Sequence, residues 1–290
     1  MKRVPLVLFW ILTATIVCSA QTTFYYPHVA NGVLGGTIWK TTIFLTNPAL
    51  SGTASGTITF TKDNCPGGNC AGANPALAGS AFAISFLDQN GASAGSGNTI
   101  TFSIPAGATR KYTSSGTGEY AGGFAVVSST GDVGGTAIFS EFDLSGRLIA
   151  EAGVPAVAAF PKQAIFVDTI GDFKIGVGYA NPGTAAASIT LSLLNSSAAS
   201  QFSTTQTLGP GNHRAAFTSE LFQGSGQLVG TMQITSSSPL VAIALRFDPT
   251  FSLFTTLPPV QLASLIYPAI EWLQRGSVAR LLGAFRLRLA

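Results

Sequence analysis

Charged side chains are scarce in this chain of 290 residues, and their scarcity limits what it can do. Asp, Glu, Lys and Arg make up 9% of the residues and leave a net charge of only +3, against about 25% charged residues in typical soluble proteins. So small an excess of positive charge does not support nucleic-acid binding. The high apolar and β-branched content also excludes disorder driven by charge.

Histidine and cysteine are rare as well, which leaves little material for catalysis. The chain has two histidines, His28 and His213, and three cysteines. A Ser-His-Asp arrangement needs a histidine that is oriented by a carboxylate and faces a nucleophile, and neither histidine lies near a nucleophile-elbow pattern. We interpret both as turn or edge histidines, and we expect no catalytic residues and no cofactor.

The first 20 residues follow the order of a secretory signal peptide. Residues 1–3 include Lys2 and Arg3, residues 4–17 are a largely apolar run without charge, and residues 18–20 form a small-residue cleavage site. The apolar run is shorter than the roughly 20 residues that a membrane span needs. We predict cleavage after Ala20 and secretion to the extracellular space or the cell surface. Lipidation of Cys18 is the alternative, although residues 15–17 suit it poorly.

The two cysteines that remain after cleavage lie close together. Cys65 and Cys70 are separated by Pro-Gly-Gly-Asn, and in an oxidising compartment such a pair is typical of a local disulfide. Zinc is the alternative, but no second pair of ligands lies nearby in the sequence. We predict a disulfide and no metal site. Residues 88–91 have a weak likeness to a calcium loop, yet their Asn-Gly pair favours a hairpin turn.

Turn-forming residues and short alternating apolar segments are abundant. The 33 glycines and 15 prolines separate segments of this kind, and residues 24–262 show no sustained helical period. We expect one helical turn at 218–222, capped by Thr218 or Ser219, and a strand pair at 228–235 and 240–247, joined by residues 236–239. The other expected strands are 37–46, 56–61, 82–87, 98–104, 124–128, 136–142, 173–180 and 187–194.

The sequence also matches itself, with matched positions in the same order along the chain. The spacing between matches shortens between Asn47 and Arg110, so the first copy carries an insertion there, which includes both remaining cysteines. Because Tyr26 and Trp39 match aromatic residues, we expect both in the repeat core. The matches are Tyr26 with Phe160, Trp39 with Phe173, Asn47 with Asn181, Arg110 with Arg214, and residues 137–143 with 242–248.

These patterns predict an all-β chain of two tandem immunoglobulin-like β-sandwich domains, with a closed barrel as the alternative. Copy one spans residues 24–156 and includes the insertion, and copy two spans residues 160–262. Residues 263–290 form a basic tail that could be helical. Contact of this tail with a membrane or a partner remains open, as does simple disorder.

Two carboxylates lie on one expected strand, and the matching positions of copy two show whether both copies share them. Glu141 and Asp143 alternate along the strand, as the acids of a glycosidase pair could. Copy two, however, has Arg246 and Asp248 at the matching positions. A solvated strand end is therefore the better interpretation.

Four residues are candidates for ligand binding. Tyr112 and Tyr120 are aromatics without an aromatic match in copy two, and exposed rings of this kind would indicate carbohydrate binding. Arg110 and Arg214 recur in both copies and could bind a carboxylate bidentately. The structural alternative is that each arginine caps a strand end or pairs with an acceptor inside its own domain.

The chain resembles repeats of uncharacterised secreted proteins from soil bacteria. The residues that carry this resemblance are 26–30, 47–48, 181–183, 209–214, 234–237 and 242–247. The resemblance implies an immunoglobulin-like sandwich and a life outside the cell, and it supplies no catalytic residues. We expect a non-enzymatic adhesion, scaffolding or interaction protein whose partner is a cell-surface protein or a polysaccharide. A carbohydrate-binding module is the first alternative, and a hydrolase is the second.

Overall fold

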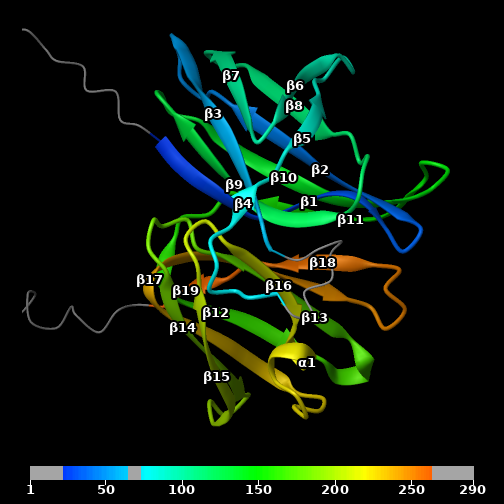
Figure 1. Cartoon of the computed structure of the whole chain (residues 1–290), viewed down its shortest axis with the longest axis vertical. Coiled ribbons are helices and arrows are strands. Elements are labelled where there is room, and N and C mark those ends of the chain that lie inside the picture. The colour runs from blue at the N-terminus through cyan, green and yellow to red at the C-terminus, as the bar shows by residue number, and fades with distance from the viewer. Residues whose placement is uncertain (1–21, 65–72, 263–290) are drawn as a thin grey trace, which may run out of the picture.

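The chain is built almost entirely of β-strands (Figure 1). The computed structural model describes residues 22–64 and 73–262, which form one eleven-stranded and one eight-stranded sheet system. This arrangement confirms the all-β prediction and is consistent with β-sandwiches. We call residues 22–156 the N-terminal half and residues 160–262 the C-terminal half. No helix within the described ranges has the length and apolar character that crossing a membrane would require.

The N-terminal half contains strands β1 to β11, and β1 joins its two layers. The first part of β1 pairs with β9, a bulge lies between Tyr26 and Val29, and the last part pairs with β2. The strands are β1 (Thr22–Leu34), β2 (Thr37–Thr46), β3 (Thr53–Lys62), β4 (Ser80–Ala81), β5 (Ile84–Leu87), β6 (Ser93–Gly97), β7 (Thr99–Pro105), β8 (Thr109–Ser114), β9 (Ala121–Ser129), β10 (Gly134–Asp143) and β11 (Leu148–Pro155).

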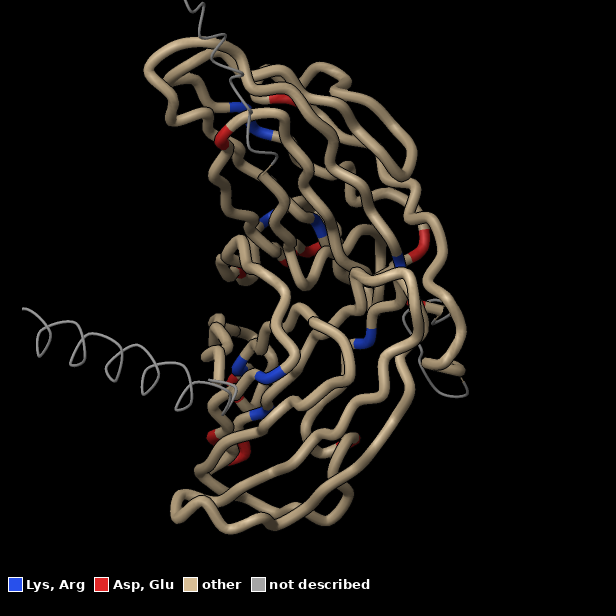
Figure 2. The backbone as a smooth tube through the Cα atoms, turned by 90° about the vertical axis from the view of Figure 1, so that its left-hand side faces the viewer, with Lys and Arg blue, Asp and Glu red and all other residues tan. Residues whose placement is uncertain are grey.

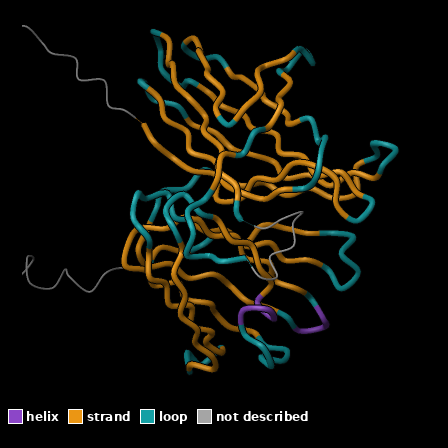
Figure 3. The backbone as a smooth tube through the Cα atoms, viewed as in Figure 1, coloured by secondary structure: helices purple, strands orange, loops and turns teal. Residues whose placement is uncertain are grey.

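The C-terminal half contains the remaining strands and two short helical turns, so loops and strands dominate both halves (Figure 3). The elements are β12 (Phe160–Asp168), η2 (Ile170–Asp172), β13 (Lys174–Ala180), β14 (Ala187–Asn195), β15 (Ser200–Leu208), β16 (His213–Phe217), α1 (Thr218–Leu221), β17 (Val229–Phe247), β18 (Phe254–Leu257) and β19 (Val260–Gln261).

Strand β17 corrects the predicted pair at 228–235 and 240–247. It is one strand of 19 residues, whose first part pairs with β12 and β14 and whose last part pairs with β13 and β18. The Ser-Ser-Ser-Pro run at 236–239 resembles a hairpin turn in sequence. Here the chain instead stays extended while it passes from one layer to the other, as β1 does after Asn31, the last of its residues that pairs with β9.

The strand pairings of the N-terminal half recur in the C-terminal half. Strand β2 pairs with β8 and β10 as β13 pairs with β16 and β17, and β3 pairs with β7 and β9 as β14 pairs with β15 and β17. The β10–β11 pair corresponds to β17–β18. Strands β4, β5 and β6 have no counterpart, and they lie where the sequence places the insertion.

Alternation along the strands produces the two cores. On β14, Ile189, Leu191 and Leu193 are fully buried while the residues between them are more exposed, because successive side chains of a strand point to opposite faces. The cluster that fills the N-terminal half also includes Ile243, Leu245 and Phe254 of the C-terminal half. The two halves therefore pack against each other through apolar contacts.

A segment of the insertion forms hydrogen bonds with the C-terminal half. The Gly79 N–H donates to the Pro210 carbonyl at 3.0 Å, and the Gly209 N–H donates to the Pro75 carbonyl at 2.8 Å. The Asn212 side chain donates to the Pro75 and Leu77 carbonyls at 3.1 and 2.9 Å. We call residues 74–79 the strap, because they bind the turn at 209–212. Cys65 and Cys70, the signal segment 1–20 with Cys18, and the tail 263–290 lie outside the described residues.

Two local predictions have different outcomes. Asp88 accepts hydrogen bonds from the N–H groups of Asn90 and Ala92 at 2.8 and 2.9 Å, and this turn joins β5 to β6, which confirms the hairpin. Helix α1 does form, but the predicted cap is wrong. Its N-cap is Phe217, whose N–H donates to the Glu220 carboxylate at 2.6 Å.

Candidate functional site

A cleft of about 790 Å³ lies between the two halves. We call it the central cleft. Side chains from β1, β2 and β10 line one side, and residues of β13, β16 and β17 line the other. Leu34 and Phe251 stand among the exposed lining residues, at 42% and 46% exposure. The central cleft is therefore open to solvent at one end and enclosed at the other.

The N-terminal wall is a continuation of a core face. Ile43 and Leu45 of β2 are fully buried in the N-terminal core, and Trp39 lies further along the same face of that strand. The Trp39 ring stacks on Phe139 of β10 at 4.9 Å between centroids. Trp39 is only partly buried and lines the central cleft, so our core prediction holds for Tyr26, which is fully buried, but not for Trp39.

Two glycines of β13 make room on the opposite wall. A Cβ at Gly176 would lie 3.2 Å from the Phe247 ring and 3.5 Å from the Phe217 ring. A Cβ at Gly178 would lie 3.4 Å from the Cβ of His28 and 3.5 Å from the Nε2 of His213. The missing side chains thus allow aromatic rings to approach the sheet at the mouth and histidine rings to approach it at the base.

The two histidines meet at the base of the central cleft. His28 Nδ1 and His213 Nε2 are 3.3 Å apart, although 185 residues separate them in the chain. The residues are only 7% and 2% exposed. His28 lies in the bulge of β1, and His213 begins β16 directly after the turn that the strap binds. The contact between the halves buries both rings, which our interpretation as turn or edge histidines did not predict.

A carboxylate completes this cluster. Asp63 Oδ2 lies 3.6 Å from His213 Nδ1, and Asp63 is 6% exposed. The carboxylate favours a proton on His213 Nδ1, which leaves Nε2 as an acceptor for a proton on His28 Nδ1. Burial, followed by the nearby His213, lowers the pKa of His28 to about 3. His28 is therefore neutral at neutral pH. Burial and the Asp63 charge hold the pKa of Tyr120 well above its usual value.

The carboxylates of Glu141 and Asp143 do not act together. Glu141 lines the central cleft, where burial raises its pKa against an opposing hydrogen bond from Thr37. Asp143 instead accepts the N–H groups of Ser145 and Arg147, both at 2.9 Å, and pairs with the Arg147 guanidinium at 3.0 Å. A hydrogen bond from the Ser145 hydroxyl at 2.6 Å, together with these contacts, holds the pKa of Asp143 well below its usual range.

Of the two tyrosines predicted to bind a ligand, one has its ring in the lining of the central cleft. Tyr120 lines it, edge-on to Trp39 at 6.2 Å. Tyr112 is 6% exposed and packs in the N-terminal core, so its prediction as an exposed ring is wrong. Arg110 is half-buried on β8, outside the lining. Arg214 borders the central cleft but donates to the Gln206 side chain, as the structural alternative proposed.

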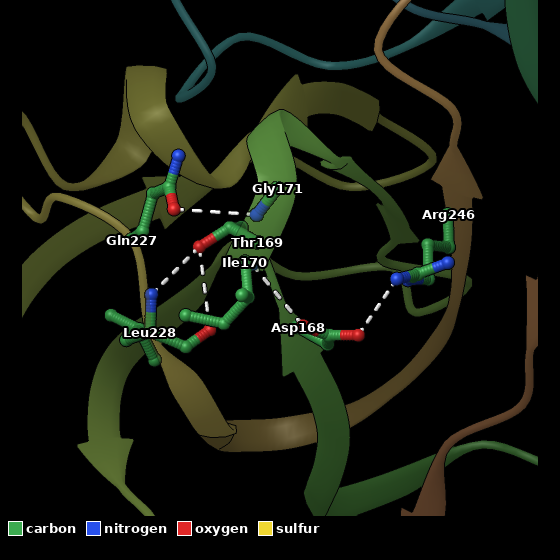
Figure 4. A network of polar contacts seen from close by, with 7 residues as sticks. All are labelled: Asp168, Thr169, Ile170, Gly171, Gln227, Leu228 and Arg246. Atoms are coloured by element: carbon green, nitrogen blue, oxygen red, sulfur yellow. Dashed lines mark hydrogen bonds and ion pairs between the residues drawn. The ribbon is translucent and has the colours of Figure 1, made fainter.

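The corresponding end of the C-terminal half carries a different polar network (Figure 4). Arg246, the match of Glu141, donates to Asp168 at 2.7 Å and lies 3.4 Å above the centre of the Phe173 ring. Thr169 and Leu228 exchange hydrogen bonds beside this pair, at 3.3 and 3.0 Å. These contacts tie the start of β13 to β12 and β17 and engage Arg246 within the C-terminal half.

Metal chemistry receives no support from residues 22–64 and 73–262, where no group of three His, Cys, Asp or Glu side chains is placed to hold an ion. Comparisons of the chain with protein-family models, curated proteins and solved structures found no match. Function is therefore inferred from the central cleft and from the sequence patterns.

Proposed function

We propose that this chain is a secreted, non-enzymatic interaction protein, made of two tandem immunoglobulin-like β-sandwich domains that hold a ligand between them. The signal-like order of residues 1–20 supports secretion. The strand pairings that recur in the two halves support a duplicated sandwich. Such a duplicated sandwich is what the resemblance of the sequence to secreted repeat proteins of soil bacteria also implies.

The central cleft is the observation that carries the binding role. Its volume of about 790 Å³ falls within the roughly 300–1,000 Å³ typical of small-molecule sites. Rings from both halves line it, so a ligand there would contact both. Because the strap and the histidine pair already hold the halves together, little ordering would have to accompany binding.

The histidine cluster supports binding over catalysis. A base that activates a nucleophile must lie within hydrogen-bond reach of it. Among the described residues, the hydrogen bonds of His28 and His213 connect their rings to each other, and no hydroxyl or thiol side chain bonds to either ring. The carbohydrate alternative loses Tyr112 to the core and keeps only Tyr120, which the central cleft encloses on one side.

A small-molecule screen with a blocked variant tests this function. Ala215 pairs with Gly178 on the wall of the central cleft, so Ala215→Phe would place a ring inside. We expect fragments that bind the mature chain, detected by ligand-observed NMR, to lose binding in Ala215→Phe. Thr205→Phe, on the exposed face of β15, should bind them unchanged. Fragments that bind all three proteins equally would place the ligand elsewhere and overturn the proposal.

A further inference from the structure

The central cleft is surrounded by aromatic rings, and this bears on which ligand it can hold. Trp39 and Phe139 form a stacked pair on the N-terminal wall, and Phe217, Phe247 and Phe251 contact one another at 5.6–5.7 Å on the C-terminal wall. Aromatic faces carry partial negative charge and attract cations within about 6 Å. The rings thus provide apolar contact and a preference for positive charge.

The charged side chains of the lining also favour a positively charged ligand. Glu141 comes from the N-terminal wall, and Glu220 from α1 stands at the opposite rim. The basic member of the described lining is Arg214, whose guanidinium donates to Gln206. Two carboxylates against one guanidinium, with His28 neutral, leave the lining of the central cleft with an excess of negative charge. Charged residues are sparse on the rest of the described chain (Figure 2), which makes two carboxylates in one cleft unusual.

Burial adds a second argument for a cation. Removing Glu141 from water raises its pKa, so its charge is only partly compensated in the free protein. A positive group placed beside it would stabilise the charged form and gain binding free energy from doing so. A neutral ligand of the same shape would make the ring contacts but would leave Glu141 uncompensated.

We infer that the ligand of the central cleft is an apolar organic cation, an amine or a quaternary ammonium whose positive group lies among the rings and beside Glu141. This inference depends on the proposed binding function and gives its ligand class. It requires no residue outside the described lining.

Two probes of nearly identical shape test the inference. Phenyltrimethylammonium and tert-butylbenzene differ chiefly in the nitrogen charge, and both can be titrated into the mature chain and followed by NMR. We expect the cation to bind about tenfold more tightly, since cation–π contacts and a carboxylate both favour it. Equal affinity, or tighter binding of tert-butylbenzene, overturns the inference but leaves the proposed function intact. If neither probe binds, or if Ala215→Phe leaves binding unchanged, the central cleft is not the site and both proposals fail.

Two variants locate the effect at the rings and the carboxylate. Glu141→Gln should reduce the affinity for phenyltrimethylammonium several-fold and leave tert-butylbenzene unchanged. Phe251→Leu, at an exposed position of the mouth, should act in the same direction without disturbing the fold. The matched control is Asp132→Asn, an exposed acid in the β9–β10 turn, which should alter neither affinity. An equal effect of Asp132→Asn and Glu141→Gln would mean attraction by net charge alone and would overturn the inference.

Discussion

The buried histidine pair makes the stability of the protein depend on pH. His28 has a pKa of about 3 in the folded chain, against 6.5 for an ordinary histidine, so the folded state binds fewer protons than the unfolded state below pH 6.5. Its contribution to stability is complete above pH 6.5 and is lost as the pH falls towards 3. The groups that face it are His213, the Asp63 carboxylate and the Phe139 ring.

The size of the effect follows from the difference between the two pKa values. Each pH unit below 6.5 removes about 1.4 kcal/mol from the free energy of unfolding. Between pH 7 and pH 5 the loss from His28 is therefore about 2 kcal/mol. Such a loss is a large fraction of the roughly 5–15 kcal/mol that stabilises a typical protein. A doubly protonated pair would also lose its hydrogen bond, because both rings would then only donate.

Urea unfolding of the mature chain at pH 7 and pH 5, with and without His28→Phe, measures this directly. The phenylalanine ring fills the same space next to Phe139, but it leaves His213 Nε2 without a partner, which costs about 1–3 kcal/mol at either pH. The comparison therefore concerns the change between the two pH values rather than the absolute stability. Wild type should lose about 2 kcal/mol more than His28→Phe on acidification. The same loss in both proteins would falsify the assignment of this pH dependence to His28.

Three further predictions concern the strap, the core and a turn. Gly209→Ala would place a Cβ 1.9 Å from the Leu77 carbonyl oxygen, and it should lower the free energy of unfolding by about 1–3 kcal/mol. The control is Gly134→Ala, whose Cβ would meet nothing within 4 Å and which should leave the midpoint of urea unfolding unchanged. Tyr112→Ala should cost about 3–5 kcal/mol as a core truncation, and Tyr112→Phe much less. NMR titration should give Asp248 a pKa of about 2, because hydrogen bonds from Thr250 and Leu253 stabilise its carboxylate; an ordinary value near 3.8 would contradict the turn geometry.

Local patterns predict some strands of this fold well, but they miss others, among them β1, β11 and β12, and they divide β17 in two. The bounds of β2 agree with the expected 37–46, and β14 follows the alternation of Ile189, Leu191 and Leu193. Proline misleads in β1 and β17, where Pro27 and Pro239 lie next to breaks in register. A proline usually marks the end of a strand in sequence. In this fold both prolines accompany irregular pairing inside a strand that continues into a second layer, and that continuation depends on tertiary packing.

The candidate site is harder to predict, because its residues come from far apart in the chain. The sequence contains one signal for it, namely where the two copies differ. His213 stands where the first copy has Thr109, Glu141 where the second has Arg246, and Trp39 where the second has Phe173. We interpreted the difference between Glu141 and Arg246 as evidence against an acid pair shared by the copies, and the match of Trp39 with Phe173 as a core position. Because the two copies pack against each other, the sequence differences between them instead mark the surfaces at which this contact requires different residues in the two copies.

The contact between the halves is head-to-tail, which explains these differences. The N-terminal half uses the face of its sheet that continues from its own core, through Trp39 and Phe139. The C-terminal half uses the opposite face, where Gly176 and Phe217 stand at the positions of Thr42 and Thr113. In the N-terminal half those two threonines are half-buried and bond to each other at 3.2 Å, as suits a face without a partner among the described residues.

The far end of the C-terminal half carries an ion pair instead of an apolar surface. If the contact repeated, the C-terminal half would present Phe173 and its neighbours to a third unit. That position instead carries Arg246, stacked on Phe173 and paired with Asp168 at 2.7 Å. Covering it with another apolar sheet would remove this pair from water without a replacement partner. The same sequence difference that gives the central cleft its carboxylate at Glu141 therefore gives the second copy a polar end, so one substitution between the copies distinguishes the wall of the central cleft from the far end of the C-terminal half.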